Sequence, residues 1–427
     1  MSFSSEPQPE GCGSRRLIHN LPVVALNICG QTRPDQIGTR SRQKTVCPLL
    51  TRRMPCRNLL GLCGRIRNME DTQLPGKTLQ FTDSGKFKIV QFTDTHYRTD
   101  KRYDCVEAVR LIEETLDAEK PQLAVYTGDI VVAGKIRKGW QDILAPCIER
   151  KIPHAVVLGN NDSEKSKLSR REIIEYISGM PFSVTRPGPK NVFGSGNYVL
   201  EIFDGNRLAN LLYCLDSNSS PPPPLEGVYD WFHDDQIAWY KKKSRDYTKR
   251  NAGKPIPAFA FFHIPLNEFG EMIHHQAVLA SDLTEYQAGA ILRTKRDYRT
   301  DLKSVLVGQR FEIECPGAVN SGMFYTMWSQ KDIMGIFVGH NHTNDYIGLN
   351  QGIALAFGRW SGSKTTYGER YVTQGARLIE LSKDGGRSFR TWIRQRGGEK
   401  FFDVQVPDDL IKRTVASPNT VLTPPVW

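Results

Sequence analysis

Short apolar runs and amphipathic segments alternate along the chain from about residue 80. Three runs are almost wholly apolar, as buried strands are: KFKIVQF (86–92), QLAVYT (122–127) and HAVVL (154–158). Residues 103–121 place apolar side chains on one helical face, and residues 136–153 are predicted to be helical at least as far as Pro146. Ser169 and Glu172 have the spacing of a capping box, which predicts that a helix begins there. This alternation predicts an α/β sandwich whose sheet begins with parallel strands.

The pattern becomes richer in strands after about residue 190. Six further apolar runs predict strands: 197–203, 208–215, 257–263, 333–339, 352–358 and 375–381. The Pro-rich segment 217–227 and the polar segment 274–304 lie between these runs and are expected to be loops. No internal repeat is visible. We therefore expect one main domain over residues 77–400, followed by a C-terminal tail over residues 401–427.

The basic charge of the chain is concentrated near its beginning. The formal net charge is +11, and residues 1–68 hold eleven Lys or Arg but only three acids, so +8 of the excess lies there. The remaining residues carry only +3. We expect residues 1–76 to form a basic, disordered extension, and nucleic-acid binding, if any, to be confined to it.

Cysteine usage and hydropathy bear on the compartment. Five of the nine cysteines lie in the extension without CxxC spacing, and the other four are widely separated, so we expect reduced and mostly buried thiols. No window approaches 18 consecutive apolar residues, so no membrane-spanning helix is expected. The apolar patch 15–30 makes a poor secretory signal, which favours a cytoplasmic location. An organellar transit segment, or an upstream segment that is not in the mature protein, are the alternatives for the extension.

Five polar clusters each follow the end of an apolar run. They are Asp94-Thr95-His96, Gly128-Asp129, Gly159-Asn160-Asn161-Asp162, His263 and Gly339-His340-Asn341-His342. A single histidine at a strand end is more often structural than functional, and an isolated Gly-Asp says little. The recurrence of such clusters after five strands carries more weight, because loops leaving the carboxyl ends of strands meet in one crevice of an α/β sheet.

These side chains are of the kinds that a two-metal hydrolytic site needs. Carboxylate and imidazole ligands suit Zn, Fe and Mn, and no cysteine is required. One carboxylate can bridge two cations roughly 3.5–4 Å apart, which then clamp a phosphoryl group and acidify the water between them. The sequence therefore predicts two divalent or trivalent metal ions as cofactors.

The order of the clusters, D-x-H, G-D, G-N-x-D, H and G-H-x-H, resembles that of the calcineurin-like metallophosphoesterase superfamily. The chain is most similar to a eukaryotic branch that includes plant proteins labelled inactive purple acid phosphatases and related fungal phosphatases. Four stretches carry this similarity: YCLDSNS (213–219), GAVNSGMF (317–324), GHNHTNDY (339–346) and GARLIELSKD (375–384). The resemblance implies a single catalytic domain, built as a sandwich of two mixed β-sheets flanked by helices.

The resemblance also implies a role for each matched residue. Asp94, His96 and His342 would bind the first metal, and Asn160, His263 and His340 the second, with Asp129 bridging them. Asn161 and Asp162 would be catalytic positions.

Two positions depart from the family patterns. Purple acid phosphatases carry a tyrosine three residues after the bridging aspartate, where this chain has Val132, so a purple Fe(III) centre is not expected. Asn161 stands where the superfamily has a histidine that assists the leaving group. An amide can donate a hydrogen bond but cannot deliver a proton. We therefore expect a weakened rather than an abolished activity.

The function expected from these residues is the metal-dependent hydrolysis of phosphoesters. A phosphomonoester is the favoured substrate, and a phosphoprotein is one candidate. A phosphodiesterase is the alternative within this class. A module that binds metal or a phosphorylated ligand without turnover is the alternative outside it, and Asn161 is the only feature in its favour.

Overall fold

The structure is a computed structural model that describes residues 79–100, 106–221, 223–225, 228–272, 307–362 and 372–408. The predicted extension 1–76, the predicted loop 274–304 and residues 409–427 of the predicted tail lie outside the described residues. The helices are α1 (Val106–Glu119), α2 (Ile136–Glu149), α3 (Asn161–Glu164), α4 (Arg170–Ser178), α5 (Asp234–Arg250) and α8 (Met323–Gln330).

A six-stranded mixed sheet contains the three strands predicted from the first apolar runs. Its order is β15-β14-β13-β2-β4-β6. The strands are β2 (Lys86–Phe92), β4 (Leu123–Thr127), β6 (His154–Val157), β13 (Gly375–Ser382), β14 (Phe389–Gln395) and β15 (Lys400–Val406). β2, β4 and β6 are parallel, whereas β13, β14 and β15 are added antiparallel. Because β15 pairs with β14, the sheet continues past residue 400, where the sequence placed the end of the main domain.

A seven-stranded mixed sheet contains most of the later predicted strands. Its order is β1-β7-β8-β9-β10-β12-β11. The strands are β1 (Leu79–Gln80), β7 (Tyr198–Asp204), β8 (Arg207–Cys214), β9 (Ala258–Phe261), β10 (Ile333–Val338), β11 (Ile347–Asn350) and β12 (Ile353–Phe357). β8, β9, β10 and β12 run parallel, and β7 and β11 pair antiparallel with β8 and β12. Two short strands, β3 (Tyr97–Arg98) and β5 (Val131–Ala133), pair separately.

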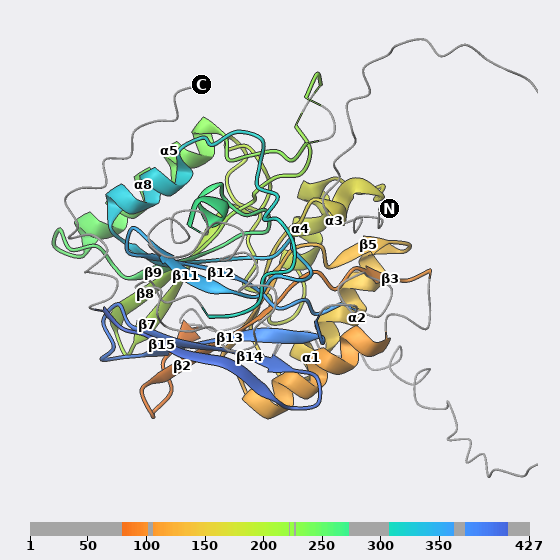
Figure 1. The fold of residues 1–427 in the computed structure, drawn as a ribbon, viewed down its shortest axis with the longest axis horizontal. Coiled ribbons are helices and arrows are strands. Elements are labelled where there is room, and N and C mark those ends of the chain that lie inside the picture. The colour runs from red at the N-terminus through yellow and green to blue at the C-terminus, as the bar shows by residue number, and fades with distance from the viewer. Residues whose placement is uncertain are drawn as a thin grey trace, which may run out of the picture. The chain divides into compact units, whose positions relative to one another are not determined.

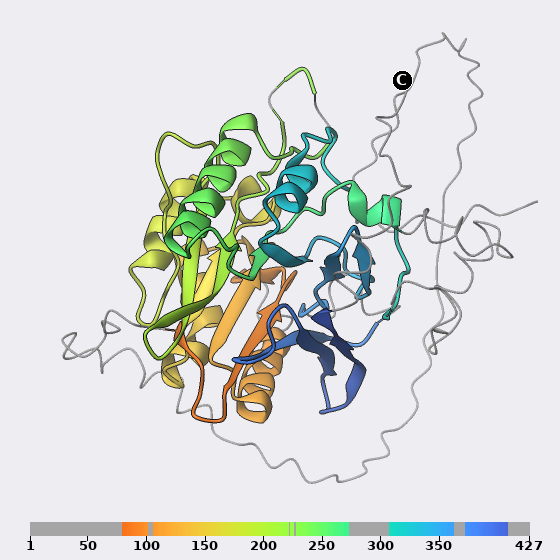
Figure 2. The same ribbon diagram turned by 90° about the vertical axis from the view of Figure 1, so that its left-hand side faces the viewer.

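The two sheets pack face to face and helices cover their outer faces (Figures 1 and 2). Buried side chains from both sheets, such as Ile89 and Phe259, share the central core. α5 and α8 pack on the outer face of the seven-stranded sheet through Tyr240 and Met327. The outer face of the six-stranded sheet is covered by α1, α2 and α4. The predicted class, two mixed sheets flanked by helices, is confirmed.

Several local predictions are also confirmed. Ser169 caps α4, because its side chain accepts a hydrogen bond from the Glu172 amide while the Glu172 carboxylate accepts one from the amide of Ser169. α2 continues through Pro146, which lies in its last turn. Cys147 and Cys214 are free and buried, as expected. Cys315, in contrast, is disulfide-bonded, which nothing in its sequence context indicated.

No helix in the described part of the chain combines the length and the apolarity that crossing a membrane requires. This finding covers only the residues that the structure describes.

The loops after the parallel strands converge at one edge of the two sheets. The Asp94 amide donates a hydrogen bond to the Gly128 carbonyl over 3.0 Å, which joins the loops after β2 and β4. The Gly339 amide donates to the His263 carbonyl over 3.1 Å, which joins the loops after β9 and β10. The His340 amide donates to Asp94 Oδ2 over 3.0 Å, which links the loops of the two sheets. The predicted clusters from both sheets therefore lie at the same edge.

Candidate metal centre

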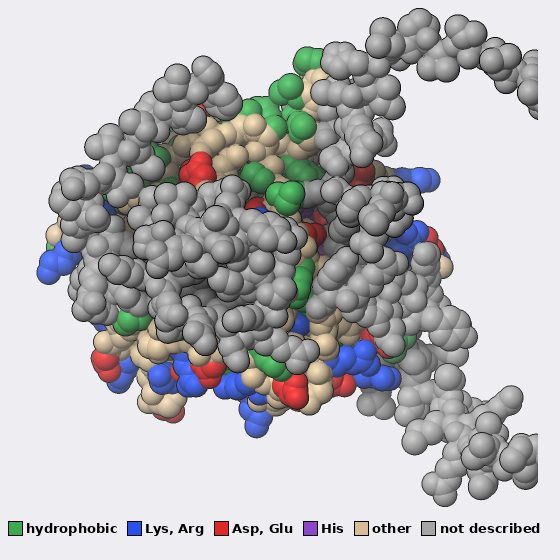
Figure 3. All heavy atoms as spheres, in the orientation of Figure 1, with side chains coloured by type: hydrophobic (Ala, Val, Ile, Leu, Met, Phe, Trp, Pro, Cys, Tyr) green, Lys and Arg blue, Asp and Glu red, His purple; other side chains and the backbone are tan. Residues whose placement is uncertain are grey.

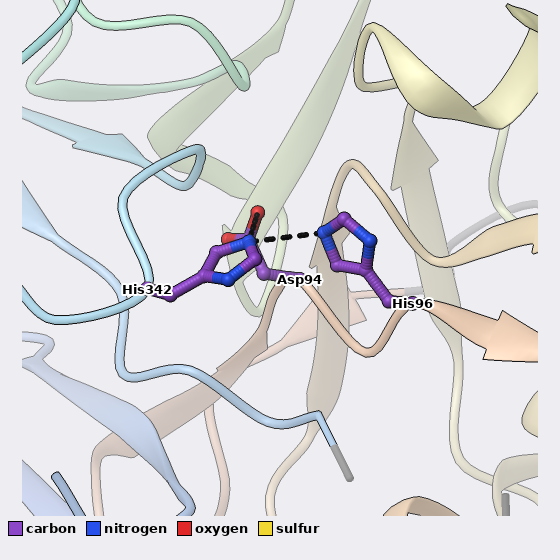
Figure 4. A group of neighbouring side chains, drawn as sticks. All are labelled: Asp94, His96 and His342. Carbon is purple, nitrogen blue, oxygen red and sulfur yellow. Dashed lines mark hydrogen bonds and ion pairs between the residues drawn. The ribbon is translucent and has the colours of Figure 1, made fainter. Parts of the chain in front are cut away.

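The first group of predicted ligands, Asp94, His96 and His342, lies together at the ends of β2 and β10. One potential ligand atom from each of the three lies within 4.8 Å of the others. The Nε2 atoms of His96 and His342 are 3.0 Å apart, and His342 Nε2 is 3.6 Å from Asp94 Oδ1. Figure 4 shows the two imidazoles directed toward each other from opposite loops, with the carboxylate beside them. A single cation could contact all three side chains.

The second group, Asp129, His263 and His340, meets the same distance criterion. His340 Nδ1 lies 3.3 Å from His263 Nε2. The predicted fourth member, Asn160, places its Oδ1 3.2 Å from His263 Nε2. Asp129, His263 and His340 are buried, whereas Asn160 is half-buried.

Asp129 lies between the two groups. Its Oδ2 is 3.6 Å from His96 Nε2 and 3.4 Å from His263 Nε2. One carboxylate oxygen thus faces a histidine of each group, as the position of a shared ligand requires.

Four of the predicted ligands hold a left-handed backbone conformation. The φ angles are 54° at Asp94, 46° at His96, 53° at Asp129 and 77° at His340. Non-glycine residues adopt such angles uncommonly, and residues held in this region cluster at functional sites. The sharp turns direct these side chains away from the strand direction and toward the shared edge.

The glycines of the three Gly-containing clusters are required by close packing. A Cβ on Gly159 would lie 2.2 Å from Asp129 Oδ1, and one on Gly128 would lie 2.5 Å from His263 Nδ1. A Cβ on Gly339 would lie 2.0 Å from the side-chain oxygen of Thr93. These distances are too short for any side chain, so glycine allows the loops to approach one another.

The donor set and its burial suit a pair of bound cations. Among the described residues, the buried His340 Nε2 has no hydrogen-bond partner, although a buried polar nitrogen without one is costly. Burial lowers the pKa of His340 to about 3, so its imidazole is neutral and can act as a ligand. Carboxylate, imidazole and amide oxygen together suit Fe, Zn and Mn. The side chains that are present therefore fit two metal ions.

The carboxylates differ in their protonation. Burial raises the pKa of Asp129, but His263, His96 and a hydrogen bond from Asn161 outweigh it, so the net pKa is lowered and the carboxylate is ionised. Burial and the neighbouring Asp129 raise the pKa of Asp94 well above its usual value, although His263 opposes them. Burial also lowers the pKa of His263, but Asp129 outweighs this effect and raises it to about 9. Without metal, His263 thus carries the positive charge that balances Asp129.

Asn161 contacts the shared carboxylate directly. Its backbone amide donates to Asp129 Oδ1 over 2.8 Å, and its side-chain Nδ2 donates to Asp129 Oδ2 over 2.6 Å. The resemblance places Asn161 where the superfamily has a histidine that assists the leaving group, and a catalytic role for this position stays a prediction. In this structure its amide holds the orientation of Asp129.

Asp162 is enclosed by backbone amides. Its carboxylate accepts hydrogen bonds from Asp129, Ile130, Val131 and Gly159, at 2.8–2.9 Å. Burial and Asp129 raise its pKa to about 6, against the opposing effect of these amides. The residue is fully buried and its oxygens are occupied. Asp162 thus holds the loop that carries Asp129, and its catalytic position stays a prediction.

An ion pair between the half-buried Arg170 and the buried Asp216, which no motif in the sequence indicates, supports the Asn160 loop. Arg170 donates to the carbonyl of Gly159 over 2.6 Å and is paired with the fully buried Asp216. Ser219 Oγ donates to the Asn160 carbonyl over 3.1 Å. Asp216 and Ser219 lie in the stretch 213–219, whose family similarity is the sequence signal for this support.

Comparisons with known proteins agree with this arrangement. Residues 87–294 match the family model described as calcineurin-like phosphoesterase. The probable inactive purple acid phosphatase 29 of Arabidopsis thaliana is 28% identical, covering 74% of this chain and 84% of the plant protein. The phosphatase DCR2 of Saccharomyces cerevisiae is 31% identical, covering 77% of this chain but only 57% of the yeast protein.

Among solved structures, a dimetal phosphatase from Danio rerio is similar with a TM-score of 0.47 and 12% identity, over 75% of this chain and 98% of that one. The family expected from the order of the motifs is thus found by the family model and by the curated relatives. The chain is similar to the calcineurin-like phosphoesterase family over residues 87–294, just under half of its length, and to these curated relatives over about three quarters of its length.

Proposed function

We propose that the protein is a metal-dependent phosphomonoesterase. Asp94, His96 and His342 would hold one metal ion, and Asn160, His263 and His340 the other. The observation that carries this proposal is the position of Asp129, whose Oδ2 lies within 3.6 Å of a histidine of each group. Seven ligand-competent side chains at one edge of the sheets favour hydrolysis over metal-free binding of a phosphorylated ligand.

The residues of the chain have separate tasks in this reaction. When bound, the metal pair supplies an activated water and neutralises charge on the phosphoryl group. Asn161 holds the shared carboxylate of Asp129 through two hydrogen bonds. The asparagine at this position cannot protonate a leaving group. Esters whose leaving group has a low pKa should therefore be hydrolysed best.

Both the relatives and the electrostatics favour a monoester. The yeast relative carries the name phosphatase, while the plant relatives carry the label inactive. Apart from the first 68 residues the chain is close to neutral, which gives little support for a long polyanionic diester. A nearly neutral catalytic domain could accept phosphoproteins as substrates. Hydrolysis of phosphodiesters is the competing hypothesis.

Paired hydrolysis assays test this proposal. Aryl phosphate monoesters and diesters are offered to the metal-loaded full chain, beside the variant Asp129→Asn. We expect turnover of the monoester, with a higher kcat/KM than for the diester, and a loss of at least about 10²-fold in the variant, because the shared ligand loses its charge. A preference for the diester would support the competing hypothesis. Bound metal without turnover of either ester would contradict both and favour a binding module.

A further inference from the structure

Three segments form a rim beside the candidate metal centre: residues 228–232, 264–272 and 308–322. We call them the acidic rim. The Tyr229 ring meets the His340 ring edge to face, with centroids 4.3 Å apart. Ile264 directly follows His263, and Asn341 Nδ2 donates to the Ile313 carbonyl over 2.9 Å. The first segment therefore contacts the predicted ligand His340, and the second begins next to His263. The third segment contacts Asn341, which lies between His340 and His342.

The acidic rim is held together by its own contacts. The Ala318 amide donates to the Tyr229 carbonyl over 2.9 Å, and Asn320 Nδ2 donates to Glu268 Oε1 over 2.9 Å. A Cβ on Gly317 would lie 2.4 Å from the Asp230 carbonyl oxygen, so these two segments are in tight contact. The rim is thus a connected wall rather than three independent loops.

A small pocket with a mixed polar and apolar lining lies between these segments. Phe232, Ile264 and Val319 are among its apolar residues, and Asp230, Asn267 and Asn320 among its polar ones. Apolar side chains also stand exposed on the rim, with 71% of Ile313, 42% of Val319 and 40% of Val228 accessible to solvent. Exposed apolar residues next to a site are typical of binding surfaces.

The charge of the acidic rim is opposite to that of the chain as a whole. Its three segments contain five acids, Asp230, Glu268, Glu271, Glu312 and Glu314, and one base, Arg310. Three of the acids are buried, so the charge that faces solvent comes from the exposed Glu271 and the half-buried Glu312. Arg310 is paired with Glu314, at 2.6 and 3.0 Å. Figure 3 shows Lys and Arg side chains mainly along the lower edge of the described surface, whereas its upper part is largely hydrophobic and uncharged. Apart from this paired arginine, the three segments of the rim contain no Lys or Arg that could bind a second phosphate or an acidic side chain.

We propose that the acidic rim binds the peptide that flanks a phosphorylated side chain, and that it selects apolar flanks over acidic ones. This inference rests on the proposed phosphomonoesterase function. Its occupant is a phosphopeptide rather than a nucleotide or a phospholipid surface. The exposed Ile313, Val319 and Val228 match apolar side chains of a peptide. The exposed Glu271 and the half-buried Glu312 repel polyanions and anionic membranes.

The test compares two phosphopeptides with the metal-loaded full chain. They have the same length and phosphorylated residue, but apolar residues flank it in one and Asp or Glu in the other. A small aryl phosphate and vesicles containing phosphatidic acid complete the panel. We expect kcat/KM for the apolar-flanked peptide to exceed that for the acidic-flanked peptide by about tenfold or more.

Two variants and a control locate the effect. Ile313→Asn, at an exposed position, should lower the preference for the apolar-flanked peptide several-fold, because contact area is lost. Glu271→Lys, also exposed, should raise kcat/KM for the acidic-flanked peptide by reversing a rim charge. Val106→Asn changes a 54% exposed valine on α1, outside the rim, and should leave the ratio unchanged.

The possible outcomes separate the two proposals. Equal kcat/KM for both peptides, or variants that do not change the ratio, would overturn the role of the acidic rim while the aryl phosphate is still hydrolysed. Faster hydrolysis of phosphatidic acid than of either peptide would overturn the choice of occupant. Failure to hydrolyse any ester would instead contradict the phosphomonoesterase itself.

Discussion

At the scale of single residues, the contacts of Asn161 could not be predicted from the sequence alone. Its type and its place after Asn160 were visible in the sequence, but its two hydrogen bonds to Asp129 depend on the loop after β4. The same holds for the left-handed φ angles at Asp94, His96, Asp129 and His340, which are set by contacts with residues far along the chain. The predicted ligand types were readable because each follows an apolar run. The contacts by which Arg170 supports the Asn160 loop were not readable from the sequence, because its partners Gly159 and Asp216 come from different loops.

The variant Asn161→His tests the consequence of losing a proton donor at this position. A histidine can deliver a proton to the leaving group, and general acid catalysis is typically worth about 10²–10⁴-fold. We expect kcat/KM for an alkyl phosphate to rise by about tenfold or more relative to an aryl phosphate, which needs little protonation. Asn161→Gln keeps the amide and is the control, for which no such change is expected. An unchanged ratio for Asn161→His would show that proton delivery does not limit the reaction.

At the scale of elements, strands with continuous apolar runs were predicted well and polar elements were missed. β2 and β10 are buried along nearly their whole length, so their runs stand out in the sequence. α5 was not predicted, because only Gln236, Tyr240 and Ser244 of its 17 residues are buried. β15 was placed in the tail, since it lies at the edge of its sheet and only Val406 is buried. Tertiary packing, not local pattern, determines these elements.

The strand β6 carries a histidine whose burial predicts how stability depends on pH. His154 is fully buried, and burial lowers its pKa to about 4, more than the backbone of Ile152 raises it. The folded state therefore binds fewer protons than the unfolded state, whose histidine has a pKa of about 6.5. The stability that the neutral ring allows is complete above about pH 6.5 and is lost as the pH falls toward 4.

The variant His154→Gln removes this titration and keeps a polar side chain of similar length. Between pH 7.5 and pH 5 we expect the wild type to lose about 2 kcal/mol more free energy of unfolding than the variant. Urea denaturation at the two pH values measures the difference, and the metal-binding histidines are common to both proteins. Equal losses in both would mean that His154 keeps an ordinary pKa in the fold.

At the scale of the whole molecule, the fold explains why distant motifs form one site. Parallel strands from two sheets end at the same edge, so residues from 94 to 342 in the sequence meet there. The order of the motifs was sufficient to predict the family and the two-sheet class, because the five clusters and the strands before them are local features. The acidic rim was not predictable, since its segments are irregular and are brought together only by the fold.

The central claim is that Asp129 is shared by two metal ions, and the metal content of the protein tests it most directly. Purified wild type and Asp129→Asn are stripped with chelator, reloaded with Zn, Mn or Fe, and analysed for bound metal after removal of the excess. We predict about two ions per wild-type chain and a clear loss in Asp129→Asn, where the shared ligand is no longer ionised. Val106→Asn, outside the site, should retain the wild-type content. A wild type that binds no metal, or an Asp129→Asn protein that holds two ions as tightly as the wild type, would contradict the account.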